Sequence, residues 1–259
     1  MRKICYRIVA PAILLLALVG AWELALRLFE VQAFILPAPS EILRTFFYQL
    51  PLLLRHGGIT LLEIALGLAC GSLGGIALAI AVFYSPILDR ALYPLIIGAQ
   101  MIPVFAIAPV LIVWLGYGIW PKVTVAALIS FFPLVINVSD GLRSPAKDSV
   151  DLFRTLGASR FQILAKLRWP ACYPSLFSGL KVATTLAVVG ATIGEWVGSH
   201  QGLGYLMLES NARLRTSLLF AAILMLALLG LCLFALLRII ERRALRWRST
   251  GDAVEGAHG

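Results

Sequence analysis

The stretch DSVDLFRTLGASRFQILAKLRW, residues 148–169, is polar, basic and amphipathic, and it lies between two long apolar runs. Leu152, Phe153 and Leu156 recur on one helical face, so they predict a short helix that ends near Leu156. Gly157 then permits a turn that a Cβ would resist. The stretch is therefore expected to form a structured loop between two membrane helices.

The second half of this stretch predicts another helix. Ser159 followed by Gln162 is a capping-box pattern, and Phe161 begins its apolar face. Trp169 precedes Pro170, which disfavours further helix, so the helix is expected to stop there. The apolar side chains either pack against the ends of the protein's own helices or dock into a groove of a partner. The number of apolar residues in this one loop favours docking into a groove of a partner.

The composition is that of a membrane protein. Of 259 residues, 60% are hydrophobic and only 14% are charged, and the mean hydropathy is +0.92. A spanning helix needs roughly 20 apolar residues. Six apolar runs meet that length: Ile8–Phe29, Ile59–Phe83, Ala91–Leu115, Pro121–Val138, Pro174–Val197 and Leu218–Ile240. We therefore expect an all-α integral membrane protein with six transmembrane helices.

These spans leave too little chain for a separate soluble domain. The sequence is expected to form a single transmembrane domain over residues 1–259, with a cytoplasmic loop at 141–173 and a disordered tail at 249–259. The basic N-terminus resembles a signal peptide. Its apolar run is too long for one and no clear cleavage site follows, so we expect an uncleaved first helix.

The net charge of +9 could suggest nucleic acid, but its distribution argues against such a partner. With a cytoplasmic N-terminus and six spans, 16 of the 22 Lys and Arg residues fall in segments on the inner side. This is the positive-inside bias of a polytopic membrane protein, so both termini are expected in the cytoplasm. The cysteines are scattered without metal-like spacing, so no metal site is expected.

Two glycine series recur every four residues along one helix face. Small residues at this spacing let helices approach closely in lipid, although direct contact with a transported solute is the alternative. The members are Gly67, Gly71, Gly75, Gly190, Gly194 and Gly198. Pro103 and Pro109 are expected to kink the third span, which either lines a pathway or only shapes the bundle.

Acidic residues in spans raise the alternative of an ion-driven secondary transporter. The candidates are Glu23, Glu63 and Glu195, which lie near predicted span ends, so the simpler interpretation is hydration at the interface. Trp114, Trp120 and Trp196 either form an interfacial belt or stack on a flat ligand. Pro103, Glu195 and Trp196 are the candidate pathway residues.

A membrane enzyme is a further alternative with little support. His56, His200 and His258 are far apart and belong to no HExxH pattern, and no GxSxG elbow occurs. No GxxxxGK[ST] phosphate loop occurs either, so this chain has no ATPase of that kind. We expect no catalytic residue.

The loop resembles a cytoplasmic pattern of the inner-membrane permease subunits of ATP-binding-cassette (ABC) importers. That pattern is Glu-Ala-Ala, three residues, Gly, nine residues, Ile-x-Leu-Pro. Here Asp151-Leu152-Phe153 is followed after three residues by Gly157 and, nine residues later, by Leu167-Arg168-Trp169-Pro170. The acid, the glycine and the proline stand in register, whereas the other positions differ. The segments TLGASR and GEWVGSHQGLGYLM resemble the branch that handles nitrate, sulfonates, taurine, thiamine-pyrimidine precursors or riboflavin.

This resemblance implies a type I importer permease in the bacterial inner membrane. Two copies form the pathway as a homodimer, two cytoplasmic ABC ATPase subunits bind the loops, and a periplasmic or lipid-anchored solute-binding protein delivers the solute. This chain is expected to bind no cofactor, since ATP is bound by the partner subunit. The resemblance slightly favours a thiamine pyrimidine precursor or riboflavin as solute. The residues implied in ATPase coupling are Asp151, Leu152, Phe153, Leu156, Gly157, Ala158, Ser159, Phe161 and Pro170.

Overall fold

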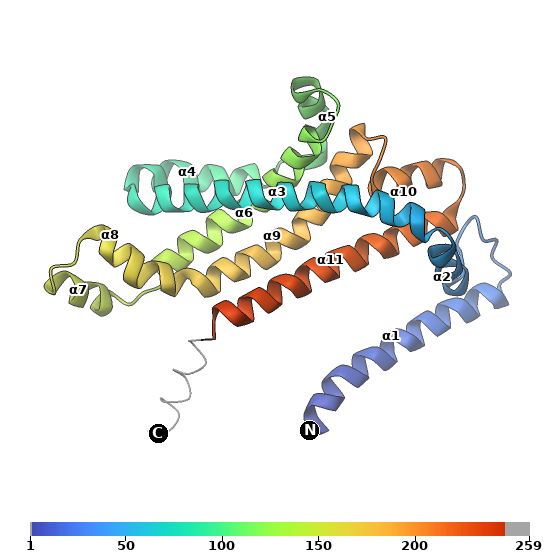
Figure 1. Cartoon of the computed structure of the whole chain (residues 1–259), viewed down its shortest axis with the longest axis horizontal. Coiled ribbons are helices and arrows are strands. Elements are labelled where there is room, and N and C mark those ends of the chain that lie inside the picture. Colours follow the sequence, from blue (N-terminus) through green and yellow to red (C-terminus); the bar gives the residue numbers. More distant parts are fainter. Residues whose placement is uncertain (1, 247–259) are drawn as a thin grey trace. The chain divides into compact units, whose positions relative to one another are not determined.

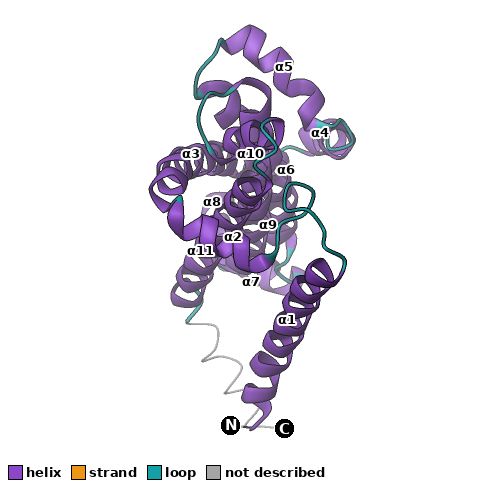
Figure 2. Ribbon diagram, turned by 90° about the vertical axis from the view of Figure 1, so that its right-hand side faces the viewer, coloured by secondary structure: helices purple, strands orange, loops and turns teal. Residues whose placement is uncertain are grey.

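The computed structural model describes residues 2–246, with the side chains of residues 2–9, 12 and 93 left aside. The predicted tail at 249–259 lies outside this range. Within it all regular structure is helical (Figures 1 and 2). The elements are α1 (Arg2–Leu28), α2 (Pro39–Tyr48), α3 (Leu50–Tyr84), α4 (Pro86–Ala99), α5 (Val104–Leu115), α6 (Trp120–Arg143), α7 (Lys147–Thr155), α8 (Arg160–Ile163), the π-helical turn η1 (Leu164–Arg168), α9 (Trp169–Gly198), α10 (Leu203–Ala212) and α11 (Thr216–Ala244).

Four helical runs are long and apolar enough to cross a membrane. They are Leu50–Tyr84, Trp120–Arg143, Arg160–Gly198 and Thr216–Ala244, and each contains one of the predicted spans. The all-α membrane fold is therefore confirmed. The first predicted span lies on α1, whose 27 residues exceed the roughly 20 that a bilayer requires. Its role as a sixth span stays a prediction.

The third predicted span is broken. A kink was predicted in this span, and helices α4 and α5 meet at an angle of 100°, so the pair is either one broken span or a re-entrant loop. The break falls where Pro103 precedes the first turn of α5. Proline disfavours the α conformation in the residue before it, which explains the break at this point. Pro109 stays inside α5.

The contacts divide the chain into two compact units, which are described separately. The first comprises Met1–Ile59 and Gln201–Ala227. In it the Glu23 carboxylate accepts hydrogen bonds from the backbone N–H of Ser40 at 3.0 Å and from its hydroxyl at 2.8 Å. Ser40 lies in the first turn of α2, whose N-cap is Ala38 and which ends at Tyr48.

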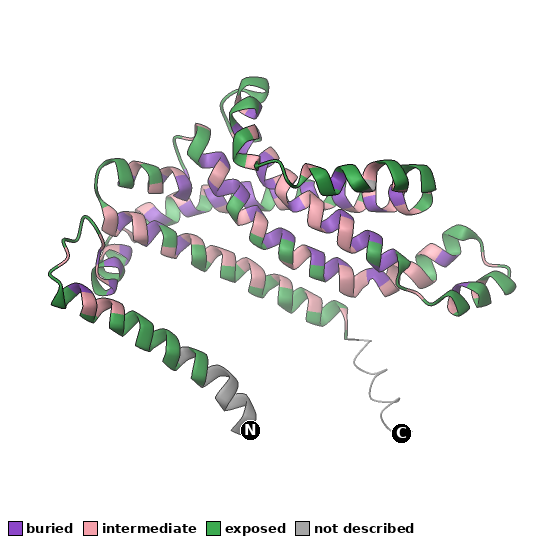
Figure 3. Ribbon diagram, turned by 180° about the vertical axis from the view of Figure 1, so that it is seen from behind, coloured by how far each residue is buried: buried purple, intermediate pink, exposed green. Residues whose placement is uncertain are grey.

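The second unit comprises Thr60–His200 and Leu228–Gly259, and in it α6 packs against α9 and α5. Buried residues recur along α6 and α9, whereas the part of α11 in this unit has none (Figure 3). The backbone of Ala126 in α6 is approached by glycines from two helices. A Cβ on Gly190 of α9 would lie 2.8 Å from Ala126 Cα, and one on Gly67 of α3 would overlap Ala126 Cβ. Glycine is required because the helices touch backbone to backbone.

The same close approach recurs one turn further along α3. A Cβ on Gly71 would lie 2.6 Å from the backbone oxygen of Ala127, and one on Gly75 would lie 2.9 Å from that of Phe131. Backbone atoms cannot move aside as a flexible side chain can. The spacing between α3 and α6 therefore depends on these glycines.

Gly71→Ala is expected to destabilise the protein by about 1–3 kcal/mol, because overpacking at a backbone contact forces α3 away from α6. Gly74→Ala is the matched control in the same helix, since its Cβ would meet only the Phe131 ring at 3.6 Å, an ordinary contact. Thermal unfolding of both variants in detergent measures the difference. Equal midpoints for the two variants would contradict the proposed packing.

Candidate functional site

Two groups of residues in the second unit are candidates for a functional site. The first is the connecting segment, residues 144–168 between α6 and α9. Val150 and Ile163 are buried and anchor it to the rest of the unit. In contrast, Leu152, Leu156 and Phe161 are 57%, 75% and 73% exposed. Three large apolar side chains in water are costly, so this exposed apolar face is suited to a partner.

The turn of the connecting segment is closed by backbone hydrogen bonds. Gly157 has φ +78°, a left-handed conformation that glycine adopts without strain. The N–H groups of Gly157 and Ala158 donate to the carbonyls of Arg154 and Phe153, both at 3.0 Å, which is the usual bonding of a helix C-terminus that ends in glycine. The turn predicted from the sequence is present.

The capping box predicted at Ser159 is also present. The Ser159 hydroxyl accepts from the backbone N–H of Gln162 at 3.3 Å, and the Gln162 side chain accepts from the Ser159 N–H at 2.8 Å. Asp151 pairs with Arg154 at 3.0 Å. Both side chains of that pair are mostly exposed, so it contributes little stability and leaves the carboxylate accessible.

The helix that begins at Arg160 does not stop before Pro170, so that prediction is wrong. It continues for 39 residues from Arg160 to Gly198. Proline clashes with the carbonyl of the residue four positions earlier, here Lys166. Lys166 lies in the π-helical turn η1, where the Trp169 N–H donates to the Leu164 carbonyl five positions back. This wider turn accommodates the proline without breaking the helix.

The second group is a buried polar cluster at the other end of α9. The Lys122 ammonium donates to Glu63 Oε1 and to the Ser199 hydroxyl, both at 2.8 Å. The Thr60 hydroxyl donates to Glu195 Oε1 at 2.6 Å. The cluster thus connects α3, α6 and α9.

The side chains of this cluster are almost completely withdrawn from solvent. Glu63, Glu195 and Lys122 are 0%, 1% and 8% exposed. The interpretation of Glu63 and Glu195 as hydrated interfacial residues is therefore wrong. Gly194 explains how Lys122 is placed, because a Cβ there would lie 2.8 Å from Lys122 Cα. The glycine lets α6 approach α9 closely enough to bury the lysine.

Sequence reasoning missed three members of the cluster: Thr60, Lys122 and Ser199. Only Lys122 left a signal, as a charged residue at the start of an apolar run, and that position is also typical of an interfacial residue. Glu195 is the only predicted pathway residue in the cluster. Trp196 is half exposed, and Pro103 caps α5. Gly198 lies against Ile112 of α5.

In the part of the chain that the structure describes, no group of three or more His, Cys, Asp or Glu side chains is placed to hold a metal ion. The connecting segment, the long helix that continues from it and the polar cluster are therefore the candidate functional features of this membrane protein.

The comparison with protein families decides the identity. Residues 71–246 match the binding-protein-dependent transport system inner membrane component family. The chain belongs to this family. It is the permease subunit of an ABC importer, and ATP is hydrolysed on a separate ATPase subunit. An ion-driven carrier and a membrane enzyme are therefore both excluded.

Relatives cover nearly the whole chain. A probable ABC transporter permease protein of Haemophilus influenzae is 40% identical over 88% of this chain and 93% of its own. The formylaminopyrimidine transport permease protein ThiX of Halalkalibacterium halodurans is 38% identical over 95% and 98%. The riboflavin transport system permease protein RibX of Chloroflexus aurantiacus is 35% identical over 93% and 90%.

A solved structure has the same fold. It is an inward-facing conformation of the MetNI methionine ABC transporter, with a TM-score of 0.60, 19% sequence identity, and coverage of 76% of this chain and 97% of the other. This likeness supports the type I importer fold and, at such low identity, nothing about the solute.

Lys122→Met is expected to cost about 3–5 kcal/mol, because it leaves the Glu63 carboxylate buried without its cation. The matched control is Lys181→Met. Lys181 pairs with Glu241 at the same 2.8 Å, but the two side chains are 28% and 18% exposed, so the loss should be smaller. Adding Glu63→Gln to Lys122→Met should recover part of the stability. The midpoint of thermal unfolding is the measurement. Equal decreases in the midpoint for the two lysine variants would contradict the claim that burial makes the Lys122–Glu63 pair the more important one.

Proposed function

We propose that this protein imports a small flat heterocycle, a thiamine pyrimidine precursor or riboflavin, as a single permease domain over residues 1–259. Two copies would form the pathway. The loop at 141–173 would dock on an ATPase subunit in each half of the transporter. The observation on which this rests most is the exposed apolar face of Leu152, Leu156 and Phe161.

This face has the features of a docking site for a folded partner. Its backbone is fixed by the Gly157 turn and by the Ser159 capping box, so little conformational entropy is lost on binding. Phe153 and Ala158, whose backbones are hydrogen-bonded across the turn, are half buried. The exposed Asp151 carboxylate offers a hydrogen-bond acceptor at its edge. The π-helical turn η1 accommodates Pro170, so the docked helix continues into α9.

The orientation follows from the charge distribution. The excess of Lys and Arg supports a cytoplasmic position for the connecting segment and both termini, on the side where the ATPase subunits would bind. A solute-binding protein, periplasmic or lipid-anchored, would then deliver solute to the opposite face. Movement of the docked segment would be transmitted along the continuous helix to the polar cluster.

Two observations support a flat heterocycle as the solute. The relatives named for formylaminopyrimidine and riboflavin are 38% and 35% identical, whereas those named for aliphatic sulfonates and taurine are 26–29% identical. In addition, Trp120 and Phe131 line a hollow of about 300 Å³ beside Gly71 and Thr124. Aromatic side chains of this kind stack on flat rings. Import of a sulfonate, taurine or nitrate is the second candidate.

Cells without this gene are expected to lose the ATP-dependent uptake of labelled hydroxymethylpyrimidine or riboflavin and to keep that of taurine and nitrate. In complemented cells, Trp120→Ala should lower uptake by about two- to tenfold through the loss of stacking. Trp114→Ala is the matched control, since Trp114 is more exposed and does not line the hollow. Loss of taurine or nitrate uptake instead, or equal effects of the two Trp variants, would contradict the proposal that the solute is a flat heterocycle.

A further inference from the structure

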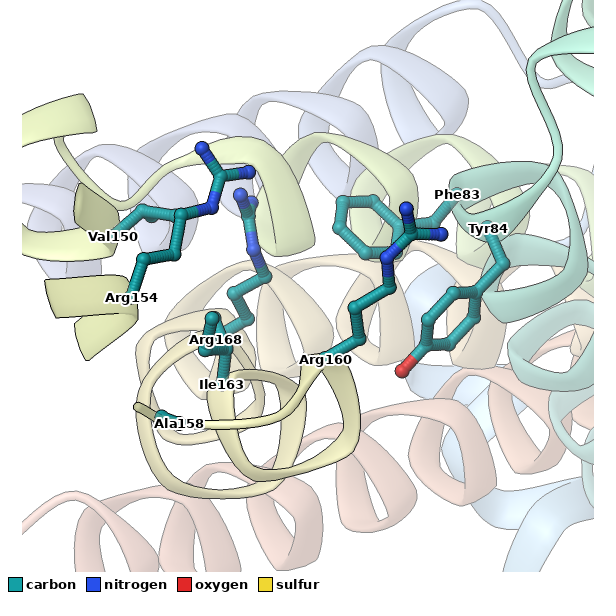
Figure 4. Close-up of a pocket in the computed structure, with 8 residues that line it drawn as sticks. All are labelled: Phe83, Tyr84, Val150, Arg154, Ala158, Arg160, Ile163 and Arg168. Atoms are coloured by element: carbon teal, nitrogen blue, oxygen red, sulfur yellow. The ribbon is translucent and has the colours of Figure 1, made fainter. Parts of the chain in front are cut away.

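A second hollow, of about 400 Å³, lies where the connecting segment meets the end of α3 (Figure 4). Three of its lining residues are arginines, and no acidic residue lines it. The lining is Phe83, Tyr84, Val150, Arg154, Ala158, Arg160, Ile163 and Arg168. In Figure 4 the three arginine side chains extend toward the same side of the ribbon, from α7, α8 and η1. We refer to this site as the basic hollow.

The basic hollow is distinct from the apolar docking face. Val150 and Arg154 are four residues apart, so they lie on one side of α7. Leu152 and Leu156 form a second such pair, and neither they nor Phe161 line the hollow. A partner seated on the apolar face would therefore leave the basic hollow accessible.

The guanidinium groups of the hollow are only partly compensated. Arg168 is held in place, because it donates to the Leu142 carbonyl at 2.7 Å and lies over the Phe83 ring at 4.9 Å. Arg154 is paired with Asp151, and it repels Arg168 electrostatically. Within residues 2–246, no hydrogen bond or ion pair is found for the Arg160 guanidinium. Positive charge is thus concentrated around an open space.

We propose that the basic hollow binds a phosphate group, supplied by an anionic phospholipid or by phosphate free in solution. Guanidinium groups bind phosphate through paired N–H donors, and three arginines line this hollow. Tyr84 adds a hydroxyl at the last residue of a membrane-spanning helix, the depth at which lipid headgroups lie. A volume of about 400 Å³ fits a headgroup rather than a protein element. The proposal rests on the cytoplasmic placement of the connecting segment.

The test uses the purified permease–ATPase complex in neutral detergent, with native mass spectrometry to count bound lipid. The probes are phosphatidylglycerol, phosphatidylcholine and inorganic phosphate. Phosphatidylglycerol is expected to bind at least fivefold more than phosphatidylcholine. Arg160→Gln should reduce this preference severalfold, and Arg154→Gln combined with it should abolish it. Arg160→Lys, which keeps the charge, should retain part of it.

Arg143→Gln is the matched control. Arg143 is the last residue of α6, next to the connecting segment. Its replacement by Gln also removes one positive charge, but Arg143 pairs with Asp89 and does not line the hollow. Displacement of the lipid by millimolar phosphate would assign the site to free phosphate, and retention would assign it to lipid. Equal binding of both lipids with no phosphate binding, or equal losses in Arg143→Gln and Arg160→Gln, would overturn the proposal.

The proposed coupling function is scored separately, by whether the ATPase copurifies with each variant. Loss of the phosphate preference with the ATPase still bound would leave the docking face intact. Loss of the ATPase from the wild-type protein would instead reject the docking face, while the lipid count would still report on the basic hollow.

Discussion

The uninterrupted helix through Pro170 is the constraint on which the account depends. The π-helical turn over Leu164–Arg168 removes the clash that proline would otherwise make, so one helical run extends from Arg160 to Gly198. At a rise of about 1.5 Å per residue, such a run is about 58 Å long. Its first turn contains Phe161 of the exposed apolar face, and its last turns contain Glu195 of the polar cluster. A displacement at one end therefore reaches the other without passing through a flexible joint.

The glycines determine what this helix can contact. Gly190 and Gly194 bring α9 against the backbone of α6, and Gly67 and Gly71 bring α3 against the same helix. Close backbone approach is also what buries Lys122 between Glu63 and Ser199. A buried ion pair is costly to desolvate, so it adds little net stability, but removing one partner is strongly destabilising. The pair therefore specifies one arrangement of the three helices more than it stabilises them. The cluster is suited to hold the helix ends in one register.

The features that sequence could predict depend on local chemistry. Glycine at a left-handed turn and a Ser–Gln capping box are determined by residues three or four positions apart, and both are present at Gly157 and Ser159. Four spans were predictable from apolar length alone. The helix through Pro170 was not, because a π turn depends on how its neighbours pack. The burial of Lys122 was not predictable either, since its partner Glu63 is 59 positions away.

The most direct test of the account is a photo-cross-link between the permease and its ATPase. A photoreactive phenylalanine analogue at Phe161 is compared with the same analogue at Phe105; these side chains are 73% and 64% exposed. Only Phe161 belongs to the exposed apolar face, so it is expected to cross-link to the ATPase subunit in the assembled transporter, while position 105 is not. A cross-link from position 105 but not from position 161, or from neither, would contradict the claim that this face is where the ATPase docks.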